Sequence, residues 1–288
     1  MKKILITGAN SYIGTSFEKW LSKYPDIYSI DTMDMIDGSW KEKNFAAYDV
    51  VFHVAGIAHS SIDPKLEPMY RKVNTELAVD TAKKAKEDGA KLFIFMSSMM
   101  IYGEDKKMCK PFIITSDTKP NPADFYADSK LKADIAIQEM DNGTFKTAIL
   151  RPPMVYGPKS KGNFPRLIKL AKKAPIFPNI KNERSMIYID NLCEFIRILI
   201  DREEHGVFFP QNADYICTTD IIRYAAKALH KKIWITKLGN PFIKLLSLKA
   251  GAVNKVFGTR VYDKNMSLMD LNYQVEGNES SIYKCIEG

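Results

Sequence analysis

The sequence predicts an α/β fold built on a doubly wound parallel sheet. Short apolar runs alternate with helical patterns along the first half of the chain, and the runs are expected to be strands. The third run is too continuously apolar for a strand with one solvated face. Strict alternation implies helices on both faces of the sheet and a ligand site beyond the C-terminal strand ends. The expected strands are 3–7, 27–30, 49–55, 91–96 and 145–150.

Helical patterns fill the intervals between these runs, at residues 13–21, 66–88 and 121–140. After Arg151 turn residues multiply, and shorter helices alternate with short strands, as expected of a smaller α+β lobe. We therefore expect a domain at residues 1–160 and a C-terminal lobe at residues 161–288, interleaved rather than strictly sequential. No structure is expected after Asp263.

Composition excludes several classes of protein. The four cysteines show no metal-ligand spacing, so neither a metal nor a disulfide framework is expected, and a reducing cytoplasm fits the chain. The net charge is +8, but no basic block is interleaved with aromatic residues, so no nucleic-acid partner is expected.

The segment from Thr7 to Gly14 joins the first strand to the first helix. Glycines allow a tight turn there and let backbone N–H groups approach a pyrophosphate at the helix N-terminus. Ser11 occupies a position that is often glycine. Asp31 ends the second strand, where a carboxylate can accept both hydroxyls of an adenosine ribose. Residues 32–34 offer no cation for a 2′-phosphate, so NAD is predicted and NADP is disfavoured.

Tyr126 and Lys130 lie four residues apart on an expected helix, so their side chains share one face. An ammonium beside a phenol favours the phenolate, which can turn a tyrosine into an acid/base near neutral pH. Ser97 and Ser98 fall at the end of the fourth strand. His53 lies in a buried strand and is expected to form a wall of the cofactor pocket.

Together these stretches resemble the extended short-chain dehydrogenase/reductase superfamily, specifically its NAD-dependent epimerase/dehydratase family. The resemblance implies a Rossmann-type sheet and a nucleotide-sugar substrate. It runs from Thr7 to about Leu192 through an ordered series of motifs. The motifs occupy residues 7–14, 49–56, 73–74, 97–103, 126–130 and 150–158.

The resemblance also assigns roles. Tyr126 would be the acid/base on the sugar hydroxyl, Lys130 would hold the nicotinamide ribose and depress the tyrosine pKa, and Ser98 would hydrogen-bond the reacting oxygen. The implied cofactor-binding residues are Gly8, Asn10, Ser11, Tyr12, Ile13, Gly14, Asp31, His53, Val54, Ala55, Gly56, Asn74, Met96, Tyr126, Lys130 and Pro153.

The reaction within this family stays open between two choices. Dehydratases carry an Asp-Glu pair after the catalytic Ser or Thr, but Met99 and Met100 stand there and cannot exchange a proton. A UDP-sugar 4-epimerase is favoured, and an NAD(P)H-dependent UDP-4-keto-6-deoxy-hexosamine 4-reductase is the alternative. A non-catalytic dinucleotide-binding sensor is the lesser alternative, because such proteins usually lose the Tyr or Lys.

Residues 161–167 and 182–192 resemble a UDP-glucose 4-epimerase-like subgroup, some members of which reduce UDP-4-keto-hexosamines. By similarity, Asn163 and Arg184 would contact the diphosphate of a UDP-sugar, and Ser98 and Met99 would also line the substrate site.

Partners other than the substrate are expected from two further stretches. Helices 66–88 and 121–140 resemble the pair that forms a homodimer in this family. Residues 241–249 mix apolar and basic residues, and they are interpreted as a helix docked on the C-terminal lobe rather than as a membrane contact.

Overall fold

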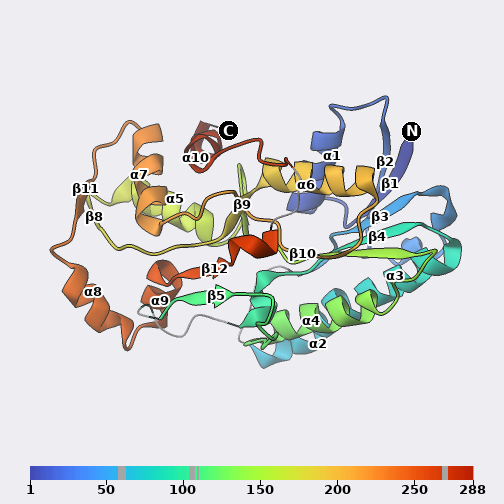
Figure 1. The fold of residues 1–288 in the computed structure, drawn as a ribbon, viewed down its shortest axis with the longest axis horizontal. Coiled ribbons are helices and arrows are strands. Elements are labelled where there is room, and N and C mark those ends of the chain that lie inside the picture. The colour runs from blue at the N-terminus through green and yellow to red at the C-terminus, as the bar shows by residue number, and fades with distance from the viewer. Residues whose placement is uncertain (58–62, 104–107, 109, 268–271, 288) are drawn as a thin grey trace. The chain divides into compact units, whose positions relative to one another are not determined.

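The computed structural model describes residues 1–57, 63–103, 108, 110–267 and 272–287 (Figure 1). The chain forms two compact units. The first consists of residues 1–103, 119–152 and 193–210, and the second of residues 104–118, 153–192 and 211–288. The expected boundary between residues 160 and 161 stays a prediction.

A six-stranded sheet forms the centre of the first unit. All its neighbouring strands pair in parallel, in the order β10-β6-β4-β3-β1-β2. Its strands β1, β3, β4 and β6 are almost entirely buried, which explains their continuous apolar sequences. The strands are β1 (Lys2–Thr7), β2 (Tyr28–Met33), β3 (Val50–His53), β4 (Leu92–Met96), β6 (Lys146–Leu150) and β10 (Gly206–Phe208).

Helices cover both faces of this sheet, so the predicted doubly wound fold is confirmed (Figure 1). The helices α1 and α6 lie on one side and α2, α3 and α4 on the other. The small side chains Ala78, Ala82 and Ala85 of α3 let that helix pack closely on the sheet core. These helices are α1 (Tyr12–Leu21), α2 (Glu67–Tyr70), α3 (Leu77–Asp88), α4 (Phe125–Gln138) and α6 (Ile189–Arg202).

Two details of the first unit depart from a regular alternation. The connection from β2 to β3 holds only the 3₁₀ turns η1 (Ser39–Lys41) and η2 (Phe45–Ala47) instead of a crossover helix. Between α2 and α3 the backbone forms a π-helical turn, η4 (Arg71–Glu76), in the middle of the expected helix. The direction of strand progression reverses between β1 and β3, which is where such sheets bind ligands.

The second unit mixes short strands with helices, as the α+β prediction requires. Three two-stranded parallel sheets pair β5 (Phe112–Ile114) with β12 (Arg260–Tyr262), β7 (Met154–Tyr156) with β9 (Met186–Tyr188), and β8 (Ile176–Pro178) with β11 (Trp234–Thr236). Its helices are α5 (Asn163–Lys173), α7 (Thr218–Ala228), α8 (Asn240–Ser247), α9 (Gly251–Phe257) and α10 (Asn278–Glu287).

Candidate functional site

The loop after β1 is held against the loop after β3. Gly8 has φ +103°, and a Cβ there would lie 2.6 Å from the backbone nitrogen of Ala55, so no other residue fits without a shift. The N–H groups of Gly8 and Ala9 donate to the carbonyl of Met33, at 2.8 and 2.9 Å. The loops after β1 and β3 therefore approach each other closely at the switch point of the sheet.

Ser11 takes the place of the often-found glycine as the N-cap of α1. Its Oγ accepts a hydrogen bond from the N–H of Gly14 at 3.1 Å, and a Cβ on Gly14 would lie 2.6 Å from that oxygen. Asn10 precedes it with φ 65°, a left-handed conformation that asparagine tolerates. Tyr12 and Ile13 then begin the helix, whose N-terminus favours an anion such as a pyrophosphate.

Asp31 lies near the end of β2 and is engaged by two residues that sequence reasoning missed. The hydroxyl of Tyr48 donates to its Oδ2, and Lys43 Nζ lies 3.8 Å from the same oxygen. A hydrogen bond with Tyr48 raises the pKa of Lys43. No Lys or Arg occurs at residues 32–34, as expected, but the fold brings Lys43 from the following link to this carboxylate.

His53 is fully buried at the end of β3. Its Nδ1 lies 2.8 Å from Thr7 Oγ1, and its ring stacks near Phe93 and Phe95. Burial, followed by the charge of Lys130, lowers the pKa of His53 to about 3. The ring is therefore neutral, which suits a structural wall and not a proton carrier at neutral pH.

The residues that follow β3 contact the end of β1 and also lie close to Lys130 of α4. Val54 and Ala55 donate their N–H groups to the carbonyl of Thr7, each at 3.0 Å. A Cβ on Gly56 would lie 3.0 Å from Asn74 Oδ1 and 3.2 Å from Lys130 Nζ. The absence of a side chain at Gly56 therefore lets both polar groups approach its backbone closely.

Asn74 lies in the π-helical turn η4, a feature often found at functional sites. Its Oδ1 accepts from the N–H of Ile57 at 2.8 Å, and its Nδ2 donates to Ser129 Oγ at 3.1 Å. Asn74 thereby ties the loop after β3 to the helix that carries Tyr126 and Lys130.

Tyr126 and Lys130 occupy the first turns of α4, which Asp124 caps by accepting the N–H of Ala127 at 2.7 Å. Lys130 Nζ donates to the carbonyl of Met96, at the end of β4, over 2.9 Å. Burial lowers the pKa of Lys130 to about 8, against the charge of Asp134. The ammonium of Lys130 is therefore directed at the C-terminal end of β4.

Ser98 follows β4 and lies close to the phenol of Tyr126. Its Oγ also accepts from the N–H of Met100 at 3.1 Å and begins the 3₁₀ turn η5 (Met99–Tyr102). Burial raises the pKa of Tyr126, and Ser98 opposes this rise only in part. The expected lowering of this pKa is therefore wrong for the protein alone, because burial outweighs the favourable contacts.

A buried ion pair lies beside this group. Asp134, one turn beyond Lys130, binds Arg151 through two hydrogen bonds of 2.9 and 2.7 Å. Ser97 Oγ donates to Asp134 at 2.6 Å, and Arg151 donates to the hydroxyl of Tyr102 at 2.8 Å. Ser97 thus has a structural role, and the network holds β4, η5 and α4 in register.

Met99 and Pro153 flank the same strand ends in sequence. The N–H of Met99 donates to the carbonyl of Pro152 at 2.9 Å, and the Met99 side chain is buried. Pro153 begins a segment of the second unit. Neither Met99 nor Met100 supplies an acid.

Asn163 and Arg184 belong to the second unit. Asn163 is the exposed first residue of α5, and its Oδ1 lies 3.4 Å from Arg166 Nη1. The guanidinium of Arg184 donates to the carbonyl of Lys255 at 2.8 Å. Within the second unit the fork of Arg184 is therefore oriented by α9.

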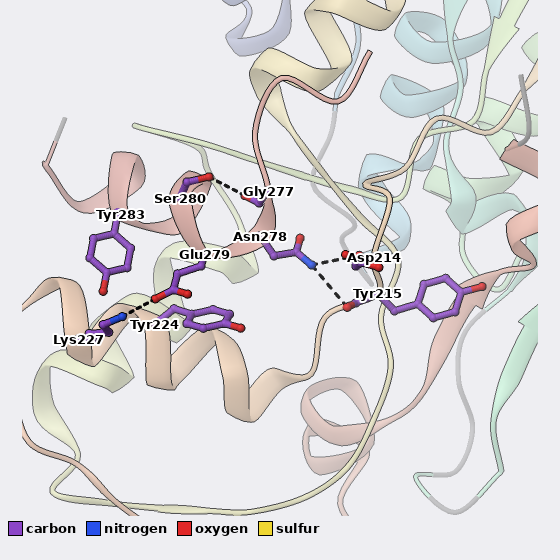
Figure 2. A pocket seen from close by; sticks show the side chains of 9 residues that line it. All are labelled: Asp214, Tyr215, Tyr224, Lys227, Gly277, Asn278, Glu279, Ser280 and Tyr283. Carbon is purple, nitrogen blue, oxygen red and sulfur yellow. Dashed lines mark hydrogen bonds and ion pairs between the residues drawn. The ribbon is translucent and has the colours of Figure 1, made fainter. Parts of the chain in front are cut away.

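An open cavity of about 810 Å³ lies in the second unit, between α7 and α10 (Figure 2). Lys227 and Glu279 form an ion pair of 2.8 Å across it, and Asn278 Nδ2 donates to the carbonyl of Asp214 at 3.1 Å. It contains none of the residues expected at the cofactor or substrate site. Its lining residues are Asp214, Tyr215, Tyr224, Lys227, Gly277, Asn278, Glu279, Ser280 and Tyr283.

Two curated relatives are similar along most of the chain. A UDP-glucose 4-epimerase from Vibrio cholerae is 31% identical over 256 residues, 81% of this chain and 77% of that protein. The N-acetyl-α-D-glucosaminyl-diphospho-ditrans,octacis-undecaprenol 4-epimerase of Escherichia coli O157:H7 is 24% identical over 279 residues, 89% of this chain and 81% of that protein.

Solved structures of two activities share the fold. UDP-glucuronic acid 4-epimerase from Bacillus cereus, in complex with NAD, has a TM-score of 0.72 at 20% identity and covers 99% of this chain and 98% of its own. A dTDP-4-dehydrorhamnose reductase from Bacillus anthracis, in complex with NADP, has a TM-score of 0.74 at 17% identity and covers 100% of this chain and 99% of its own.

A family model places this similarity on the whole first unit and beyond. The model for the NAD dependent epimerase/dehydratase family matches residues 4–209, from β1 through β10. NAD is thus the cofactor of the family to which the predicted resemblance pointed. The chain belongs to the NAD-dependent epimerase/dehydratase family.

Proposed function

We propose that the protein is an NAD-dependent 4-epimerase of a UDP-hexose or UDP-N-acetylhexosamine, with Ser98, Tyr126 and Lys130 as its catalytic residues. The observation that carries the proposal is that α4 places Lys130 Nζ 2.9 Å from the carbonyl of Met96 at the end of β4, where Ser98 follows and acts on the phenol of Tyr126. A hydroxyl, a phenol and an ammonium at the C-terminal strand ends suit proton transfer at a carbinol oxygen.

NAD, when bound, supplies the hydride chemistry by accepting hydride from the sugar carbon and returning it. The phenol of Tyr126 exchanges the hydroxyl proton, and Ser98 donates to the oxygen while negative charge develops on it. Because its pKa is raised, Tyr126 is protonated in the protein alone, the form that returns a proton to the oxygen when the hydride comes back; taking the hydroxyl proton in the first half-reaction requires the phenolate. Lys130 adds positive charge nearby.

The chain's own residues fit a dinucleotide. The Gly8 turn would let a pyrophosphate approach the backbone closely, and the N-terminus of α1 would hold it. Asp31 would accept the ribose hydroxyls. Gly56 and Asn74 would border the nicotinamide side, where a Cβ on residue 56 would meet Lys130.

Dehydration is disfavoured by the same geometry. The residues that follow Ser98 are Met99 and Met100, so no carboxyl group is available there to expel water across the sugar ring. Asp124 is committed to capping α4. The proposed reaction is therefore confined to hydride transfer at one carbon.

A 4-keto reductase is the second candidate, favoured by one observation. Lys43 lies next to Asp31, where a cation would meet the 2′-phosphate of NADPH. A reductase would use the same three catalytic residues and differ in taking hydride from added NADPH. The sensor alternative is weakened, because a non-catalytic sensor does not need Tyr126 and Lys130 together.

Several finer features are part of this proposal. Asn163 and Arg184 would contact the substrate diphosphate, to which a guanidinium fork is suited. A homodimer would form through the exposed faces of α2–α3 and α4; light scattering that gives a monomeric mass would contradict it. The cytoplasmic location stays an expectation from the scattered cysteines.

The test incubates the purified protein with UDP-glucose, UDP-N-acetylglucosamine and a UDP-4-keto-6-deoxy-hexosamine, with and without NADH or NADPH. Because one relative is named for a sugar on undecaprenyl diphosphate, a polyprenyl diphosphate N-acetylhexosamine is included. Inversion at C4 without added reductant, read by NMR, supports the epimerase. Product formed only from the keto sugar, with consumption of reductant, replaces it with the reductase.

A further inference from the structure

The second unit has an exposed apolar surface that the proposed chemistry does not use. It is formed by β11, by α8 and by the residues directly around them. Leu238 is 81% exposed, Phe242 64%, Leu245 65% and Leu248 71%. We call it the α8 surface; its apolar members are Trp234, Leu238, Phe242, Leu245, Leu246 and Leu248, and its basic members are Lys237, Lys244 and Lys249.

The helix α8 packs on α9 as the expected docked helix, but with a face other than its apolar stripe. Only Ser247 is buried on this helix, and Ile243, on the same side one turn earlier, is half-buried. Phe242, Leu245 and Leu246 follow the spacing i, i+3, i+4, so they share one face, and that face is exposed. The helix is docked, but its apolar stripe is not the face that docks.

Charge around this helix has a single sign. Residues 231–259 include six lysines and no aspartate or glutamate. Lys237, Lys244 and Lys249 form no ion pair with any residue that the structure describes. An ordinary solvated face mixes both charges. A second copy of the chain would bring the same positive charge to this face, which disfavours contact between copies.

We propose that the α8 surface binds the headgroup region of a membrane that contains anionic phospholipid. Exposed Trp, Phe and Leu on a short helix, bordered by lysines, suit partial insertion at the interface. The lysines would attract anionic headgroups. No described helix is long and apolar enough to cross a membrane, so the contact is peripheral. The proposal does not depend on the catalytic one, since Ser98, Tyr126 and Lys130 belong to the first unit.

Flotation of the full-length chain with lipid vesicles tests the proposal. One set of vesicles is phosphatidylcholine alone, and the other is phosphatidylglycerol and phosphatidylcholine in equal parts. We expect binding to the second set, much weaker binding to the first, and a loss of affinity at high salt. Equal binding to both sets, or to neither, would overturn the proposal.

Two matched variants separate the contributions. Neutralising the lysines in Lys237→Gln/Lys244→Gln/Lys249→Gln should weaken binding about fivefold per lysine, or about a hundredfold together. The control Lys3→Gln/Lys19→Gln/Lys119→Gln changes the net charge equally on exposed residues of the first unit, outside the helices proposed to form the dimer. The two triple variants should therefore differ strongly.

The apolar contribution is tested with Leu245→Ser/Leu248→Ser, which should weaken binding about tenfold or more. Its control is Ile36→Ser, at a residue that is 91% exposed in the first unit. All these positions are exposed, so the fold should persist, and circular dichroism checks this. If light scattering shows a dimer that the leucine variant dissociates, the surface is a contact between copies and the proposal fails.

Discussion

The two units differ in where they place side chains that are costly to bury or to expose. The first unit buries charge and satisfies it: Arg151 and Asp134 form a two-bond ion pair that Ser97 and Tyr102 complete. The second unit leaves apolar side chains exposed along α8. Buried, fully bonded polar groups fix a geometry, whereas an exposed apolar face is available to bind. This contrast suggests that the first unit holds the chemistry and the second unit supplies contacts.

The largest effect should come from the chemistry of the first unit. Tyr126→Phe removes the proton-exchanging hydroxyl but keeps the ring in its buried place, so turnover should fall about 10²–10⁴-fold. Steady-state assays measure this turnover, with the substrate that the incubation experiment identifies. Tyr24→Phe, on a tyrosine remote in sequence, is the control and should keep its activity. Undiminished turnover in Tyr126→Phe would remove the catalytic assignment.

The ion pairs of the two units offer a direct comparison of stability. Arg151→Met leaves Asp134 buried without its partner, so the free energy of unfolding should fall by about 3–5 kcal/mol. Arg223→Met breaks the exposed pair with Asp220 in the second unit and should cost about 1 kcal/mol or less. Urea titrations measure both. Equal losses would show that burial does not distinguish the two units.

Buried charge in the first unit should also make stability depend on pH. The pKa of Lys130 is lowered from 10.5 to about 8 in the folded state. Below pH 8 the lysine is protonated in both the folded and the unfolded state, so the folded state carries the full free-energy cost of the buried charge. As the pH rises towards 10.5, the unfolded state binds more protons, and stability should increase by about 3 kcal/mol at most.

Lys130→Met should lack this increase, while Lys244→Met, on the exposed α8 surface, should keep it. The free energy of unfolding by urea, followed across the interval between the two pKa values, measures the difference. Parallel pH curves for the wild type and Lys130→Met would contradict the buried ammonium.

The smallest expected effect concerns the cofactor. Lys43 lies beside Asp31 and would favour a 2′-phosphate, so Lys43→Ala should lower the preference for NADP over NAD by a few-fold, or about 1 kcal/mol or less. Lys41→Ala, an exposed neighbour in sequence, should leave the ratio of the two affinities unchanged. Dissociation constants of NAD and NADP, measured by fluorescence titration for both variants, test this prediction.

Sequence predicted the parts of the fold that depend on local patterns. The strand and helix rhythm, the turn at Gly8 and the spacing of Tyr126 and Lys130 are all local, and each appears in the structure. Lys43 reaches Asp31 only because the link from β2 to β3 folds back through two short turns, and no periodicity signals that.

The balance between opposing energetic effects could not be predicted from the sequence either. The pKa of Tyr126 depends on how strongly burial opposes the contacts of Ser98, which spacing cannot weigh. The helix α10 forms where weak periodicity indicated no structure, because it packs on α7. Exposure of the α8 stripe is likewise a tertiary property, since the same spacing suits a docked helix.

The central claim is that hydride leaves and returns to one sugar carbon, and a UDP-hexose labelled with deuterium at C4 tests it most directly. Incubated with the protein and NAD, without added reductant, the sugar should invert at C4 and keep its deuterium, as read by NMR. A sugar that does not invert, or a product that takes its hydride at C4 only from added NADH or NADPH, would contradict the claim.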